Sequence, residues 1–460
     1  MEISDLKHLY WRLGFGVSPA QLEEYQQLSR EKVVDLAFAK AQSLQSLSID
    51  LSPFEVLREK GARKKMTTDT FRSLRQKGRQ MTRDLNHMWL QQLSLPEAGL
   101  REKMTLFWTN VFVCRDNMVW NTLWYHNMLR EHALGNLRDF LKAMSRQPAM
   151  LNYLNSNKNV KNSPNENFVR ELMELFTLGI GNYTETDVQE GARAFTGWSS
   201  NRQAQFIIRD RQHDGGVKTF LGKTGNWNGD DIIDIILEQK ACARFICKKI
   251  YRYFVNPQVD EVRLQEITDL FYANYDIEKL MRYIFSSDWF YEAQHKGVKI
   301  KSPVELLAGI QKVVPTAFNK EKQLFYLQKM MGQVLFYPPN VAGWKGDRSW
   351  IDANTLVLRM NLASAMLNNM QIEFQEQAAF EDSFEDFYKV KKKRKTHLKV
   401  TVDWELFEKN YRNQTVQELK DILLATTLDV DTARFIDDLP ATDKRIRCVQ
   451  LMSLPEYQMC

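Results

Sequence analysis

The chain has 460 residues, of which 44% are hydrophobic and 12% aromatic, so it can form a large core and is not a mainly disordered protein. Its formal charge of +6, from 63 basic and 57 acidic residues, is small for this length and points to no polyanionic partner, so we expect no nucleic-acid partner. Five cysteines are few and odd in number, which favours a reducing compartment over a disulfide framework.

The first residues, MEISDLKHLYWRLGFG, have mixed charge and lack the apolar run of a signal peptide. We therefore predict a cytoplasmic protein, with export by another route left open. The longest uncharged run, from Met330 to Trp344, contains Pro338 and Pro339 and is too short to cross a bilayer. The chain is accordingly predicted to be soluble, without a membrane span.

Apolar residues recur with helical spacing along nearly the whole chain, so the predicted fold class is mainly α: a large irregular multi-helix domain with one small β-hairpin. The hairpin is predicted from the β-type runs QFIIRD and VKTFLG on either side of the turn RQHDGG. The predicted helices cover residues 19–40, 68–94, 98–113, 119–135, 137–146, 165–178, 185–196, 230–238, 240–254, 260–274, 277–286, 302–313, 321–332, 352–368, 403–410, 416–425 and 443–452.

The one change of composition is the segment EFQEQAAFEDSFEDFYKVKKKRKTHLKV, acidic and then strongly basic. A solvated linker or insertion explains it better than a nucleic-acid or lipid site, because no aromatic residues alternate with the basic ones. We therefore predict a main helical domain over 1–372, a charged linker or insertion over 373–402, and a small helical segment over 403–460 that packs on the main body.

Residues 163–198 are expected to form a helical hairpin. Ser163 and Glu166 have the spacing of a capping box at the first helix start, and Thr184 and Asp187 have it at the second. Glycines in the intervening turn favour the end of the first helix.

Charged residues of this hairpin and of the following turn are the candidate catalytic groups. Arg170 stands four residues from both Glu166 and Glu174, on one helical ridge. If the ridge faces solvent, the charges form a surface ion network; if it faces inward, they suit acid–base or metal-assisted hydrolysis. The predicted catalytic residues are Arg170, Glu171, Glu174, Asp187, His213 and Asp214. No metal-ligand set is predicted, and the cofactor is unknown.

Two loop tryptophans beside glycines, with two asparagines, are the candidate substrate-binding groups. Such tryptophans stack on sugars in carbohydrate sites, although more often they close the edge of a helical core. The asparagines could bind a substrate through their amides or cap a turn. The predicted substrate-binding residues are Asn167, Trp198, Asn340 and Trp344.

The segment PNENFVRELMELFTLGIGNYTETDVQEGARAFTGW resembles the signature of the bacterial DUF 1800 family, in the form found in Bacteroidota. HDGGVKTFLGKTGNWNGDDIIDIIL, KSPVELLAGI and PPNVAGWKGDRSWIDANTLVLRMN resemble its later blocks, and LYWRLGFG resembles its start. The family has no assigned function. The resemblance implies a protein partner related to sulfatases or phosphatases, and a role with surface glycans or polymers.

One motif departs from the family pattern. Where relatives tend to read Phe-Trp-His-x-His-Phe, this chain reads FWTNVF, with Thr109 and Val111 at the two histidine places. A histidine pair there would suit a metal or acid–base site, and valine cannot replace it.

Two functions remain open from the sequence. The first is a binding or scaffold component of a bacterial surface-polymer or glycan-handling system; the second is a hydrolase that uses the carboxylates, the histidine and the arginine, with or without a metal. No phosphate loop, dinucleotide fingerprint or nucleophile elbow is present in the sequence, which disfavours nucleotide-dependent chemistry. Candidate groups that converge in a concave pocket would favour the enzyme, whereas caps and surface pairs would favour the scaffold.

Overall fold

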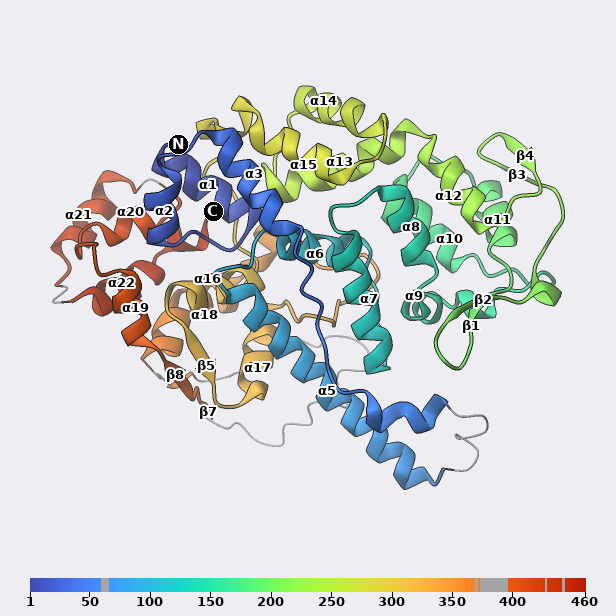
Figure 1. The fold of residues 1–460 in the computed structure, drawn as a ribbon, viewed down its shortest axis with the longest axis horizontal. Helices are drawn as coiled ribbons and strands as arrows, with labels where there is room; N and C mark the ends of the chain where they lie inside the picture. The colour runs from blue at the N-terminus through green and yellow to red at the C-terminus, as the bar shows by residue number, and fades with distance from the viewer. Residues whose placement is uncertain (59–65, 369–370, 373–395, 427, 441–442) are drawn as a thin grey trace.

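The computed structural model describes residues 1–58, 66–368, 371–372, 396–426, 428–440 and 443–460. The fold is mainly helical, as predicted (Figure 1). Both ends of the chain lie near α1 (Ile3–Leu13), where Arg12 donates a hydrogen bond to Cys460 Sγ over 3.3 Å. No helix in these ranges is long and apolar enough to cross a membrane.

The N-terminal helices follow the predicted pattern with one division. The predicted helix over 19–40 is two helices, because the Ser29 side chain accepts the backbone N–H of Lys32 and caps a new start. The helices are α1, α2 (Pro19–Tyr25), α3 (Arg30–Ala41), η1 (Ser52–Arg58), α5 (Thr68–Ser94), α6 (Leu100–Val111), α7 (Val119–His132), α8 (Leu137–Ser145), α9 (Pro148–Tyr153) and η2 (Ser156–Lys158).

In the middle of the chain, one predicted helix changes its geometry. The helix predicted over 165–178 begins as α10 (Asn167–Glu171) and continues as a π-helix, η3 (Leu172–Thr177). The others are α11 (Glu185–Ala194), η4 (Asp210–Gln212), α12 (Gly229–Leu237), α13 (Lys240–Phe254), α14 (Glu261–Tyr272), α15 (Ile277–Ser286), η5 (Asp288–Tyr291) and η6 (Ala293–His295).

The remaining helices come from the C-terminal third. They are α16 (Pro303–Val313), α17 (Glu321–Met331), η7 (Asp347–Trp350), α18 (Ala353–Leu367), α19 (Trp404–Asn410), α20 (Leu419–Leu423), α21 (Val430–Asp438), α22 (Lys444–Met452) and η8 (Pro455–Gln458). Helix α22 packs on α18 and α20.

The strands of the described residues form small two-stranded antiparallel sheets. The predicted pairing of QFIIRD with VKTFLG is wrong, since each run has a nearer partner. Leu221 and Gly222 form a tight turn between the strands of the second pair, and the loop over 201–205 joins the strands of the first. The segment between the two predicted runs forms η4 instead. The pairs are β1 (Trp198–Ser200) with β2 (Phe206–Ile208), β3 (Lys218–Phe220) with β4 (Lys223–Gly225), β5 (Thr316–Phe318) with β8 (Val400–Val402), and β6 (Gln371–Ile372) with β7 (Thr396–His397).

Buried apolar residues form two clusters within the described part of the chain. One joins α1–α3 with α6–α15, and the other joins α5 with α16–α22. Helices α6 and α7 contribute to both clusters. The segment 403–460 thus shares its core with the preceding helices, whereas most of the predicted linker, residues 373–395, lies outside the described residues.

Candidate functional site

The two predicted helix starts of the 163–198 hairpin have different outcomes. Thr184 and Asp187 form the predicted capping box at α11. Ser163 does not cap α10: its backbone N–H donates to the Val160 carbonyl over 2.8 Å, in a turn that precedes the helix. The helix begins later, at Asn167, whose backbone N–H donates to Asn165 Oδ1 over 3.1 Å. Asn167 is exposed there.

Arg170 lies at the surface of this hairpin. It donates to Glu166 over 2.8 Å and to both carboxylate oxygens of Glu185, one of them over 3.0 Å. The Arg170 side chain is 36% exposed and that of Glu185 is 61% exposed. Arg170 therefore pairs with Glu166 on its own helix and with the more exposed Glu185 of α11, so these charges form a surface ion network.

Glu171 and Glu174 lie beside this arginine and are partly buried. Glu174 accepts a hydrogen bond from Tyr183 Oη over 2.9 Å. Burial raises the pKa of Glu171, and the neighbouring charge of Glu174 raises it further. These two carboxylates and Arg170 form one group of the predicted site.

His213 and Asp214 form a second group around an arginine that the sequence analysis did not select. Arg193 donates to Asp214 over 2.8 Å and to Glu190 over 2.9 Å. The hydrogen bond from Arg193 lowers the pKa of Asp214. His213 Nδ1 lies 2.8 Å from the carbonyl oxygen of Thr196.

The Asp187 carboxylate connects α11 to a neighbouring turn. One of its oxygens completes the capping box, and the other accepts the backbone N–H of Leu221 over 2.7 Å. Its carboxylate is thus used in fixing α11 to the turn between β3 and β4. Asp187 thus completes a cap, and Arg170 and Asp214 form ion pairs, so these three predicted catalytic residues already have structural partners.

The predicted substrate-binding residues also separate. Trp198 is 2% exposed and packs edge-on against Phe195 and Phe206 in the core. Asn340 accepts the backbone N–H of Ala342 over 2.9 Å and so closes a turn. Trp344 is different, because it lines a large cavity.

This cavity, which we call the Lys299 cleft, has a volume of about 600 Å³. It lies where α6, α13, the start of α16 and the loop over 342–350 meet, at the boundary of the two buried clusters. Such boundaries are common places for ligand sites. The basic groups in its lining are Lys249, Arg252, Lys299, Lys345 and Arg348, and the carboxylates are Glu305 and Asp347.

Lys299 is positioned by the C-terminal end of the chain. Its backbone pairs with Cys460 in both directions, over 3.1 and 2.8 Å. Lys301, two residues further along, contacts other aromatic rings and does not line the cleft. The Lys301 ammonium lies between the rings of Trp11 and Tyr457 and donates to the Tyr457 carbonyl over 2.6 Å.

Lys299 has no comparable partner. Its residue is 7% exposed, and its ammonium lies 4.2 Å from the centre of the Tyr253 ring. Among the described residues, its ammonium has neither a hydrogen-bond acceptor nor a carboxylate within ion-pair distance. Burial lowers the pKa of Lys299 to about 8.

Glu305, the nearest acidic residue of the cleft, is already paired. It binds Lys103 in an ion pair whose side chains are 2% and 0% exposed, and it accepts from Tyr253 Oη over 3.3 Å. Burial alone would raise the pKa of Glu305, but the charges of Lys103 and Lys299 outweigh burial and lower it. Lys103 therefore forms the ion pair with Glu305, whereas Lys299 interacts with Glu305 at longer range and lines the cavity.

A pair of hydrogen bonds fixes the loop that carries Trp344. Asn110 Oδ1 accepts the backbone N–H of Trp344 over 2.7 Å, and Asn110 Nδ2 donates to its carbonyl over 3.0 Å. Gly343 has φ +76°, and a Cβ there would lie 2.3 Å from Asn110 Oδ1, so the close approach requires glycine.

The FWTNVF segment contributes to the wall of the cleft. Val111 lines the cleft and is 4% exposed. Thr109 is buried, and its hydroxyl donates to the carbonyl of Thr105, one turn earlier in α6, over 2.8 Å. Of the two places where the resemblance leads one to expect histidine, one therefore borders the cavity.

Three exposed cations, Arg252, Lys345 and Arg348, form the rim of the cleft. Throughout the ranges that the structure describes, none of them forms an ion pair. The net charge of the whole chain is small, so it does not indicate that positive charge is concentrated at this cleft. The available signal was the alternation of two lysines in VKIKSPVELL, which the sequence analysis did not use.

No three histidine, cysteine, aspartate or glutamate side chains of the described residues come together as a metal site.

Comparisons with known proteins place the chain in a family. No curated protein and no solved structure matches the chain. A model of the family described as "Protein of unknown function (DUF1800)" matches residues 8–459, which is nearly the whole length. The chain therefore belongs to the DUF1800 family.

Proposed function

We propose that this protein binds an anionic ligand in the Lys299 cleft and acts as a binding or scaffold component of a bacterial surface-polymer or glycan-handling system. The observation that carries the proposal is the buried residue Lys299, whose ammonium has no hydrogen bond or ion pair among the described residues, beside a cavity of about 600 Å³. An uncompensated buried charge costs stability, and groups with perturbed pKa values cluster at functional sites.

The lining of the cleft supports an acidic glycan as the ligand. Lys299 and the rim cations would pair with carboxylate or sulfate groups. Trp344 and Trp350, which are 6% and 7% exposed, border the same space and offer apolar edges to the C–H faces of sugars. We extend the proposal to a protein partner related to sulfatases or phosphatases, and to the Bacteroidota-type form of the family.

The positions of the candidate catalytic groups favour binding over the hydrolase alternative. Arg170, Glu171, Glu174, Asp187, His213 and Asp214 do not line the cleft. Inside the cleft, the Glu305 carboxylate is held as an ion pair by Lys103, and Val111 stands where a histidine would be needed.

Isothermal titration calorimetry with an oligogalacturonate hexamer and with the neutral hexamer cellohexaose tests the proposal. We expect the acidic hexamer to bind and Lys299→Met to weaken it by roughly 10- to 100-fold, the value of one charge-assisted hydrogen bond. Lys32→Met, at an exposed position far along the chain, is the matched control. Equal binding of both hexamers, or unchanged affinity in Lys299→Met, contradicts the proposal, and cleaved hexamer in the same mixtures would favour the hydrolase.

A further inference from the structure

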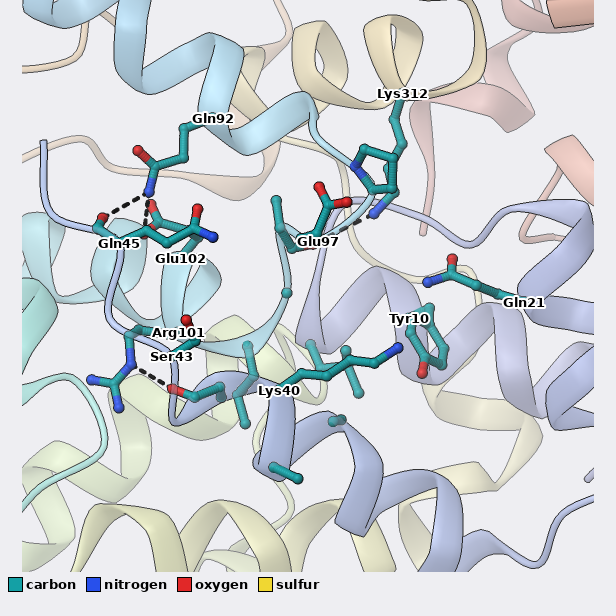
Figure 2. Close-up of a pocket in the computed structure, with 18 residues that line it drawn as sticks. Tyr10, Gln21, Lys40, Ser43, Gln45, Gln92, Glu97, Arg101, Glu102 and Lys312 are labelled. Atoms are coloured by element: carbon teal, nitrogen blue, oxygen red, sulfur yellow. Dashed lines mark hydrogen bonds between the residues drawn. The ribbon is translucent and has the colours of Figure 1, made fainter. Parts of the chain in front are cut away.

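A second cavity, which we call the Lys312 pocket, lies on another part of the molecule and has a volume of about 450 Å³. It is enclosed by α1–α3, the turn over 95–99 between α5 and α6, and the end of α16 (Figure 2). None of its lining residues borders the Lys299 cleft. Its floor is apolar, formed by Leu13, Ala37, Ala41 and Leu100.

Two charged residues of the pocket form hydrogen bonds within the protein. Arg101 donates to the carbonyl groups of Ala41 and Arg130, over 2.5 and 2.8 Å. Glu102 accepts from Arg130 over 2.6 Å and from the indole of Trp89 over 2.8 Å. Both carboxylate oxygens of Glu102 are thus bonded, and Arg101 is held against the surrounding backbone.

Lys40 and Lys312 are the two lysines in the lining of the pocket. Lys40 donates to Tyr25 Oη over 2.8 Å, and Lys312 makes one long hydrogen bond, 3.4 Å, to the Ala98 carbonyl. In the part of the chain that the structure describes, neither has a carboxylate within ion-pair distance. The two side chains enter the pocket from different walls, Lys40 from α3 and Lys312 from α16 (Figure 2).

The electrostatics of Lys312 indicate a place for added negative charge. Burial lowers the pKa of Lys312 to about 8. Glu97 raises this pKa, whereas the charges of Lys103 and Lys40 lower it further. An anion between Lys40 and Lys312 would remove their mutual repulsion and offset the desolvation of Lys312.

We propose that the Lys312 pocket binds a small aliphatic dicarboxylate, with one carboxylate on Lys40, the other on Lys312, and the methylene chain on the apolar floor. Two cations on separate walls suit two anionic groups better than one, and the Leu and Ala floor suits methylene groups. The polar side chains of Tyr10, Gln21 and Gln92 also line the pocket.

Glu97 gives the proposal a diagnostic sign. It is exposed in the lining of the pocket and acts electrostatically on Lys312. An anionic ligand has to compete with this carboxylate, so Glu97→Gln is expected to strengthen its binding. A cationic ligand would instead lose an attractive partner, and its affinity would fall.

Titration calorimetry of the full chain with glutarate, butyrate and cadaverine tests the proposal, since the three probes differ mainly in their end groups. We expect glutarate to bind, butyrate to bind roughly tenfold more weakly, and Lys40→Met and Lys312→Met each to reduce glutarate affinity roughly tenfold or more. Glu97→Gln should raise glutarate affinity by a few-fold.

Two features keep this test independent of folding and of the Lys299 cleft. Lys40 and Glu97 are exposed, so their variants can be checked by circular dichroism and read even if Lys312→Met does not fold. Lys299→Met should leave glutarate binding unchanged. Absence of glutarate binding, preferential cadaverine binding, or a fall in glutarate affinity in Glu97→Gln would overturn the assignment.

Discussion

The 163–214 region and the Lys299 cleft differ in how far their charged side chains are paired and exposed to solvent. In the first, Arg170 and Arg193 each bind two carboxylates and remain 36% and 29% exposed. In the second, Lys299 is buried and forms no ion pair with any described residue, although it lies near the buried pair of Lys103 and Glu305. A dense run of charged residues thus forms solvated ion pairs here, whereas the buried lysine of the cleft comes from the short segment VKIKSPVELL.

The largest effect is expected from breaking the buried pair under the cleft. Glu305→Gln leaves the Lys103 ammonium buried without its counter-charge, so the free energy of unfolding should fall by about 3–5 kcal/mol. Urea unfolding at pH 7 measures this. Glu190→Gln, in the surface pair with Arg193, is the matched control and should cost less than about 1 kcal/mol. If both variants lose a similar free energy of unfolding, the buried pair is no more important for stability than the surface pair.

Lys299→Met should change stability in the opposite direction. The pKa of Lys299 falls from 10.5 to about 8 in the folded protein, so the charged form is penalised by folding at neutral pH. Replacing it with methionine should raise the free energy of unfolding at pH 7 by on the order of 2 kcal/mol. Lys345→Met, at the exposed rim, should leave stability nearly unchanged.

The sign of this effect has a pH signature. As pH rises, Lys299 loses its proton at a lower pH in the folded chain than in the unfolded chain. The free energy of unfolding of the wild type therefore rises between a pH of about 8, the pKa in the folded chain, and 10.5, the ordinary pKa of lysine. The advantage of Lys299→Met should therefore be full below pH 8 and disappear near pH 10 to 11. A variant that is less stable than wild type at pH 7 would show that Lys299 supports the fold.

Ligand affinity should depend on pH in the same window. The ammonium form binds an anion, so affinity should be greatest below pH 8 and fall by about tenfold from pH 7 to pH 9. Glu305 and Cys460 raise the pKa of Lys299, while Arg12 and Lys103 lower it. Lys249, in the same lining, also has a pKa lowered by burial to about 8 and adds to the slope. Calorimetry across this range should show a shallower dependence in Lys299→Met.

Local sequence patterns predicted what depends on neighbouring residues. The Thr184–Asp187 capping box needs one turn of helix and is present. The Ser163 cap failed because residues 160–163 form a turn, in which Lys161 also donates to the Gln212 carbonyl over 2.9 Å. The mainly α fold was predictable for the same reason, since helices such as α8 and α15 bury one face and show that pattern over a short window.

The cleft was not predictable, because its features come from distant segments. Lys103 and Glu305 are 202 residues apart, and the burial of Lys299 depends on pairing with the last residues of the chain. Among the predicted site residues, Trp344 borders the cavity because Asn110 holds its loop from another helix. Local spacing along the chain carries no record of such contacts.

The smallest effect is expected at Arg170, the residue that the sequence made most conspicuous. Its guanidinium is 36% exposed, and both partners are solvated, so Arg170→Ala should lower the free energy of unfolding by only about 0.5–1 kcal/mol. A double-mutant cycle with Glu185→Ala, followed by urea unfolding, isolates the pair, whose coupling should be below about 1 kcal/mol and should weaken in 1 M salt. Binding of acidic hexamer should be unchanged in Arg170→Ala, since this residue lies outside the cleft. A loss above about 3 kcal/mol would place Arg170 with Glu305 as a structural charge, and a loss of hexamer binding would move the ligand site to the hairpin.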